Sequence, residues 1–247
     1  MGETVDDLIA RMVALLAALD ADGDPGRFFL GTYLRITRAV RSALDDELFE
    51  DPAWVQTWDV DFAGLYLDAL EASRRDPATA PAPWRRAFGA APTLRPEGHV
   101  LLGVNAHINF DLPQSLVRVI PTEEFADPAA LARRQRDHER IDGVLASRVA
   151  GEDVELQRAG DPRTWLDRLL TPANHLATRI FLRESRRKVW ANTTVLHRAR
   201  LAGDWEYRRR LAELETLSDG RVADLLRPGP VLLRLAVRGF GVSLPAD

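Results

Sequence analysis

Residues 99–117 read HVLLGVNAHINFDLPQSLV, and between Val100 and Val117 the only formal charge is that of Asp111. Apolar side chains occur all round the helical wheel of this segment, and a helix that is apolar on every side is usually buried. The segment therefore predicts a helix at the centre of the molecule, with its polar residues buried alongside its apolar ones. Pro113 is expected to kink or end this helix just after Asp111, which would open a cavity there.

Helix signals dominate the rest of the chain. Thr4 and Asp7 resemble a capping box before a regular apolar stripe, and Asp51-Pro52 combines an N-cap with a proline at the first helical position. Related openings recur at Asp127-Pro128, Asp161-Pro162 and Thr171-Pro172, while further helices are expected over 204–217, near 221–226 and after Pro230. No period-two alternation or Asn-Gly hairpin signal is visible. The sequence predicts an all-α protein, a single compact domain over 1–247 with about eight to ten helices.

The stretch 76–98 contains five prolines, together with Trp84 and Phe88. This composition is typical of a long loop, and we expect either a surface loop or a lid over a pocket. A domain linker is less favoured, because three helices before it would make a poor independent core.

Composition excludes several function classes. The chain has 247 residues, 46% of them hydrophobic and 28% charged, which is ordinary for a globular protein and argues against disorder. With no cysteine, thiol nucleophiles, cysteine–zinc sites and iron–sulfur clusters are excluded. No apolar run approaches the roughly 20 residues of a membrane-spanning helix, and the acidic N-terminus does not resemble a secretory signal. We expect a cytoplasmic protein that makes no membrane contact.

The polar residues of the central segment are the main candidates for chemistry. Asn105 and Asn109 are four residues apart, as are His107 and Asp111, so each pair shares one strip of a helix. His107 braced by Asp111 is predicted to be a catalytic acid–base pair, with Asn105 and Asn109 as substrate anchors. The alternative is a closed polar network that only fixes the position of the helix. The reaction expected of these groups is non-redox, of hydrolase, cyclase, isomerase or lyase type, on a small-molecule substrate and without a cofactor.

Other side chains are candidates to complete the pocket from preceding helices. Substrate contacts are expected from Arg35, Asp61 and Tyr66, and Asp59 is a further candidate.

A divalent metal site is the first alternative. His138 and Asp142 repeat the spacing of His107 and Asp111, and two facing helices that each donate His and Asp could bind zinc, manganese or iron. The alternative ligand set is therefore His107, Asp111, His138 and Asp142.

A non-catalytic module that binds a small ligand or a protein is the second alternative, and an oligomer of identical subunits stays open. Residues 179–210 carry ten basic side chains against three acidic ones, with aromatic residues among them. Such runs are usually solvated helix faces, and the net charge of −4 argues against general affinity for nucleic acid. Nucleic acid is therefore not favoured as a partner.

The block Asn-Ala-His-Ile-Asn-Phe-Asp-Leu-Pro, residues 105–113, resembles the central motif of a family of mainly actinobacterial proteins of unknown function. The segments 58–62 and 66–70 are more loosely similar to an upstream helix of that family, and 137–142 is similar to a downstream part that would have Asn at the position of Asp142. The resemblance implies a compact helical domain. It implies no reaction, so no catalytic residue follows from it.

Overall fold

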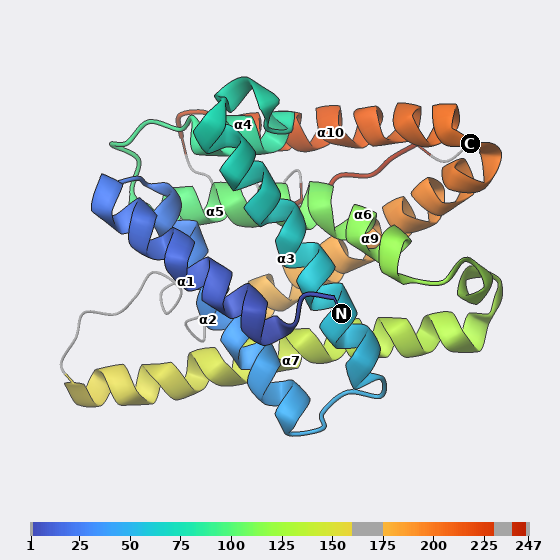
Figure 1. The fold of residues 1–247 in the computed structure, drawn as a ribbon, viewed down its shortest axis with the longest axis horizontal. Coiled ribbons are helices and arrows are strands. Elements are labelled where there is room, and N and C mark those ends of the chain that lie inside the picture. The colour runs from blue at the N-terminus through green and yellow to red at the C-terminus, as the bar shows by residue number, and fades with distance from the viewer. Residues whose placement is uncertain (1, 160–174, 230–238, 246–247) are drawn as a thin grey trace.

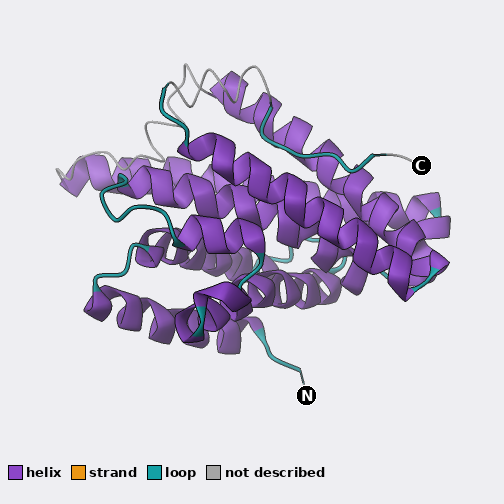
Figure 2. Ribbon diagram, turned by 90° about the horizontal axis from the view of Figure 1, so that it is seen from above, coloured by secondary structure: helices purple, strands orange, loops and turns teal. Residues whose placement is uncertain are grey.

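A computed structural model describes residues 2–159, 175–229 and 239–245, with the side chains of 142, 145–159 and 175–183 left undescribed. Within these ranges all the regular secondary structure is helical, with loops and turns between the helices and no strand (Figure 2). The all-α prediction, with its eight to ten helices, is confirmed. No helix in the described ranges is both long enough and apolar enough to cross a bilayer.

The α-helices and the shorter turns follow one another along the chain in this order: α1 (Val5–Asp22), α2 (Gly26–Asp45), α3 (Pro52–Arg75), η1 (Pro77–Thr79), α4 (Ala82–Phe88), α5 (Pro96–Ala106), η2 (His107–Asp111), α6 (Leu112–Val119), η3 (Thr122–Ala126), α7 (Pro128–Ala159), α9 (His175–Ala202) and α10 (Asp204–Leu226).

The helix starts predicted at Thr4, Asp51 and Asp127 are confirmed. Thr4 and Asp7 form the reciprocal capping box of α1, and Asp51 caps α3 by accepting from the Trp54 amide at 3.1 Å. Asp127 accepts from the first amides of α7 in the same way. The openings at 161–162 and 171–172 and the helix expected after Pro230 lie outside the described residues.

The expected break between 217 and 221 is wrong. α10 runs unbroken from Asp204 to Leu226, with Gly220 inside it. Buried Leu214, Ser218 and Val222 recur at intervals of four residues along one face of α10, so tertiary packing outweighs the modest cost of one helical glycine.

The central helix is confirmed, but Pro113 does not end it. α5, η2 and α6 run continuously through the middle of the molecule (Figure 1), and η2 is a π-helical turn. Pro113 has no N–H to donate to the carbonyl of Asn109, four residues earlier, and its ring would clash with that carbonyl. The helix widens instead, so that the Leu112 N–H reaches back five residues to the carbonyl of His107.

The prediction of a loop over 76–98 is also wrong. This stretch contains α4 and the start of α5, and Trp84 of α4 is fully buried. α4 is fixed to α10, since the Ala82 amide donates to Glu215 at 2.7 Å and Arg86 pairs with Asp219 at 2.5 Å. Pro83 lies in the first turn of α4, where proline favours a helix start rather than a loop.

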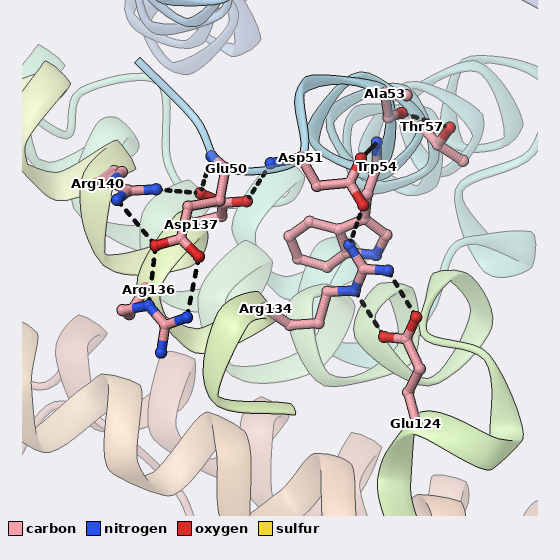
Figure 3. A network of polar contacts seen from close by, with 10 residues as sticks. All are labelled: Glu50, Asp51, Ala53, Trp54, Thr57, Glu124, Arg134, Arg136, Asp137 and Arg140. Carbon is pink, nitrogen blue, oxygen red and sulfur yellow. Dashed lines mark hydrogen bonds and ion pairs between the residues drawn. The ribbon is translucent and has the colours of Figure 1, made fainter. Parts of the chain in front are cut away.

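The start of α7 is attached to the α2–α3 turn through Asp137 (Figure 3). Asp137 is completely buried and accepts from the backbone amides of Glu50 and Asp51 at 2.8 and 2.9 Å. Arg134 pairs with Asp51 at 2.6 Å and with Glu124 at 2.7 Å, and it lies over the Trp54 ring. Because charge-assisted bonds satisfy these buried groups, this end of α7 has one defined position.

Candidate active site

The predicted His107–Asp111 pair forms inside the π-turn. His107 Nδ1 lies 2.8 Å from Asp111 Oδ2, and the two residues are only 3% and 2% exposed. A third residue joins them, because Trp84 Nε1 donates to the same carboxylate oxygen at 2.8 Å. The result is a buried chain of three groups, Trp84, Asp111 and His107, in which the carboxylate orients the imidazole.

Burial controls the protonation of this chain. It lowers the pKa of His107 and raises the pKa of Asp111, while the bonds to His107 and Trp84 favour the ionised carboxylate. The imidazole is therefore neutral at physiological pH. With Asp111 ionised, Nδ1 carries the proton that bonds the carboxylate, and Nε2 presents a free lone pair.

Aromatic rings enclose the imidazole. Phe62 stacks face to face on His107 with a centroid separation of 3.7 Å, and Tyr33 meets it edge-on at 4.8 Å. Phe29, Tyr66 and Trp84 place their ring centroids 5.9–6.0 Å from it. Gly103 allows this packing, because a Cβ there would lie 2.5 Å from Phe29 Cγ.

Several buried polar atoms around the imidazole have no hydrogen-bond partner among the described residues. They are His107 Nε2, Tyr33 Oη, Tyr66 Oη and Asp59 Oδ2. Burial raises the pKa of Tyr33 and the charge of Asp59 raises it further, which places Asp59 near that phenol. Burial also raises the pKa of Asp59 to about 7. Because buried polar groups are normally paired, such a group is a candidate for contact with a ligand.

The two asparagines have a different partner from the expected substrate. Asn105 and Asn109 both donate from Nδ2 to the carbonyl of Phe240 at 3.3 Å. Asn109 also donates to the carbonyl of Asn105 at 3.0 Å and accepts from the Val242 amide at 3.1 Å. In this structure their amides hold the C-terminal segment of the same chain.

A small cavity of about 20 Å³ lies one layer of rings away from His107. It is lined by Phe29, Tyr66 and Trp84, which also contact the imidazole, and by His99 and Gly103 of α5 among other residues. A space of that size holds about one water molecule. His107, Asp111 and the two asparagines do not line this cavity.

Of the other predicted substrate contacts, only Tyr66 lies beside the pair. Arg35 is exposed and donates to Thr32 Oγ1 at 3.3 Å, so it does not belong to this enclosed group. Asp61 lies 3.7 Å from Arg118, and its side chain is 26% exposed.

His138 does not offer a free lone pair to a metal. Trp190 Nε1 donates to His138 Nδ1 at 3.0 Å, and burial lowers the pKa of His138 to about 3, so the neutral ring carries its proton on Nε2. Ring contacts connect His138 to His107 through Trp58 and Phe62. The described side chains contain no group of three or more potential ligands that could hold a metal ion, and the side chain of Asp142 lies outside them.

Tyr33 and Trp84 were missed as site residues by sequence reasoning. No sequence signal marks Tyr33 as a site residue, and Trp84 lies in a stretch whose prolines predict a loop. Their positions depend on how α2 and α4 pack against the π-turn, and no local spacing signals that. An indole inside a proline-rich stretch was the one available hint.

These features define a helical protein with a buried Trp–Asp–His chain at a π-turn of its central helix. The family model described as "Family of unknown function (DUF5995)" matches residues 5–228, and the chain belongs to that family. The resemblance noted from residues 105–113 is thereby confirmed at the level of a family of unknown function. Neither the curated proteins nor the solved structures include a significant match to this chain.

Proposed function

We propose that this protein is an enzyme of small-molecule metabolism in which His107, oriented by Asp111, transfers a proton. The observation that carries the proposal is the imidazole Nε2, which is buried and has no partner among the described residues. The opposite nitrogen is held by a carboxylate at 2.8 Å, which is the arrangement that orients a general base.

The surroundings indicate what kind of substrate fits. Rings make up most of the enclosure, so a mainly apolar or aromatic molecule with one polar group matches it. The phenols of Tyr33 and Tyr66 and the carboxyl of Asp59 would supply the polar contacts. A substrate would enter by displacing the rings that lie between the small cavity and His107, which are Phe29, Tyr66 and Trp84.

Proton transfer at this site needs no cofactor. His107 Nε2 would take a proton from the bound substrate, or from a water molecule in hydrolysis, while Nδ1 keeps its bond to Asp111, and it would return that proton to the product or to the leaving group. Reactions of hydrolase, cyclase, isomerase or lyase type can proceed by such a step.

The test is conversion of small molecules in an extract of the source cells, followed by mass spectrometry. We expect wild-type protein to consume at least one component and to form a matching product. His107→Asn keeps a donor to Asp111 but lacks Nε2, so it should convert the component at least about 100-fold more slowly.

His197→Asn is the matched control, since His197 is also a buried histidine but stacks on Phe125, which is not one of the rings that contact His107. It should stay within about twofold of wild type, and circular dichroism should show that each variant is folded. Equal conversion by folded His107→Asn, or no conversion by wild type, would contradict the proposal.

A further inference from the structure

Residues 239–245 lie along the molecule without helix or strand, and side chains of other elements hold their backbone. The Phe240 amide donates to Glu184 at 3.4 Å, and the carbonyls of Gly241 and Pro245 accept from Lys188 at 3.0 Å and Arg210 at 3.4 Å. We call the surface that holds this segment the tail groove; it is formed by residues of α5, η2, α9 and α10: Asn105, Asn109, Glu184, Lys188, Asn192 and Arg210.

Two asparagines make the central contacts of the tail groove. Asn109 donates to the carbonyl of residue 240 at 3.3 Å and accepts from the amide of residue 242 at 3.1 Å. Asn192 repeats the pattern one step along, donating to the carbonyl of 242 at 3.0 Å and accepting from the amide of 244 at 2.8 Å. A carboxamide has both a donor and an acceptor, so each asparagine replaces part of a neighbouring strand.

These contacts recognise an extended backbone, not one particular side chain. Side-chain preference comes from burial, because Val242 and Leu244 are 7% and 6% exposed and belong to the main hydrophobic cluster, whereas Ser243 is exposed. The close approach of the backbone to α9 adds a preference for glycine at positions 239 and 241. A Cβ at Gly241 would lie 2.8 Å from Lys188 Cδ, and Gly239 has a φ of +73°.

The tail groove lies inside the region matched by the family model, whereas residues 239–245 do not. The match covers 5–228, and every groove residue falls within that range. Asn109 and Asn192 are each 1% exposed with residues 239–245 in place, and this segment supplies both a donor and an acceptor to each amide.

From this we infer that the tail groove is a binding site for an extended peptide. Residues 239–245 are its ligand within the same chain, and the same sequence supplied as a separate peptide can take their place. The ligand class is a short segment of the form Gly-aromatic-Gly-Val-any-Leu. This inference does not depend on the proposed enzymatic function.

The first test examines residues 239–245, called the tail below, by amide hydrogen exchange in the full wild-type chain. The amides of Val242 and Leu244 donate to asparagines, while that of Ser243 makes no hydrogen bond with the described residues. We expect the first two to exchange at least about tenfold more slowly than Ser243, independently of protein concentration. Equal exchange would overturn the inference, and protection lost on dilution would overturn the assignment to the same chain.

The second test supplies the peptide separately. The full chain carrying Val242→Asp and Leu244→Asp has its tail released, and a labelled peptide with the sequence of residues 238–245 should bind it in an anisotropy titration. N-methylation at Val242 removes the N–H that donates a hydrogen bond to Asn109, and it should weaken binding at least about tenfold. The matched peptide methylated at Ser243 should bind within about twofold of the unmodified one.

If the double variant fails to fold, Gly241→Leu offers another way to release the tail, because a side chain there would collide with Lys188. Absence of peptide binding to a folded, released chain would overturn the inference. So would equal loss from both methylations, or unfolding of both variants, which would make the tail an integral part of the core.

Discussion

Replacing Asp59 with Asn should stabilise the protein at neutral pH and have almost no effect in acid. Asp59 lies in α3, is 5% exposed, and its Oδ2 has no partner among the described residues. Burial raises its pKa from 3.8 to about 7. The folded state therefore prefers the protonated carboxyl, and the unfolded state loses that proton at much lower pH.

The sign and size of the effect on the free energy of unfolding follow from the pKa values of Asp59 in the unfolded and folded states. Well below pH 3.8 the carboxyl is protonated in both states, so burial of its charge costs nothing. As the pH rises from about 4 to 7 the unfolded state alone ionises, and folding loses free energy, up to a plateau above pH 7. The difference of roughly three pKa units, at about 1.36 kcal/mol each, corresponds to about 4 kcal/mol.

Urea unfolding of wild type and Asp59→Asn from about pH 4 to pH 8.5 measures this effect. The difference between the two proteins should grow from near zero to a few kcal/mol in favour of the variant. The difference is the quantity to follow, because His138 affects the wild-type curve with the opposite sign over an overlapping range.

Asp68→Asn is the control, since Asp68 lies on the same helix with its side chain 74% exposed, where a pair with Arg11 contributes little. Its free energy of unfolding should stay within about 1 kcal/mol of wild type. A difference between Asp59→Asn and wild type that does not change with pH would refute the argument that burial of the Asp59 carboxyl costs stability.

Three further predictions concern the core around the site. His138→Gln keeps an acceptor near Trp190 but cannot be protonated. Because burial lowers the pKa of His138 to about 3, protonation destabilises folded wild type in acid. In urea titrations the variant should therefore have the higher free energy of unfolding below about pH 6.5, by about 5 kcal/mol near pH 3. Equal acid sensitivity of the two proteins would contradict this. Trp84→Phe removes one of the two donors to Asp111 and should cost about 1–3 kcal/mol of unfolding free energy by the same titration, whereas an unchanged midpoint would show that the bond contributes nothing. Gly103→Ala places a Cβ against Phe29 and should lower stability by about 1–3 kcal/mol in thermal unfolding, while Gly64→Ala, which has open space around it, should not.

The sequence alone determined the fold class and the central pair. Capping residues such as Thr4 and Asp51 act on their own helix, so they could be found without knowing what the helix packs against. The apolar wheel of 99–117 likewise required burial. His107 and Asp111 meet because they are four residues apart on one helix, and that separation is local information.

Only the tertiary structure decided what surrounds that pair. Phe62, Tyr33 and Trp84 come from three different helices, and the tail that occupies Asn105 and Asn109 comes from more than 130 residues further along the chain. Packing against α10 also stabilises α4 within 76–98, where the prolines suggested a loop. It is likewise the packing of the helices that leaves Arg35 exposed. Local spacing specifies contacts within a helix, whereas contacts between helices depend on which faces are buried together, and no local pattern encodes that choice.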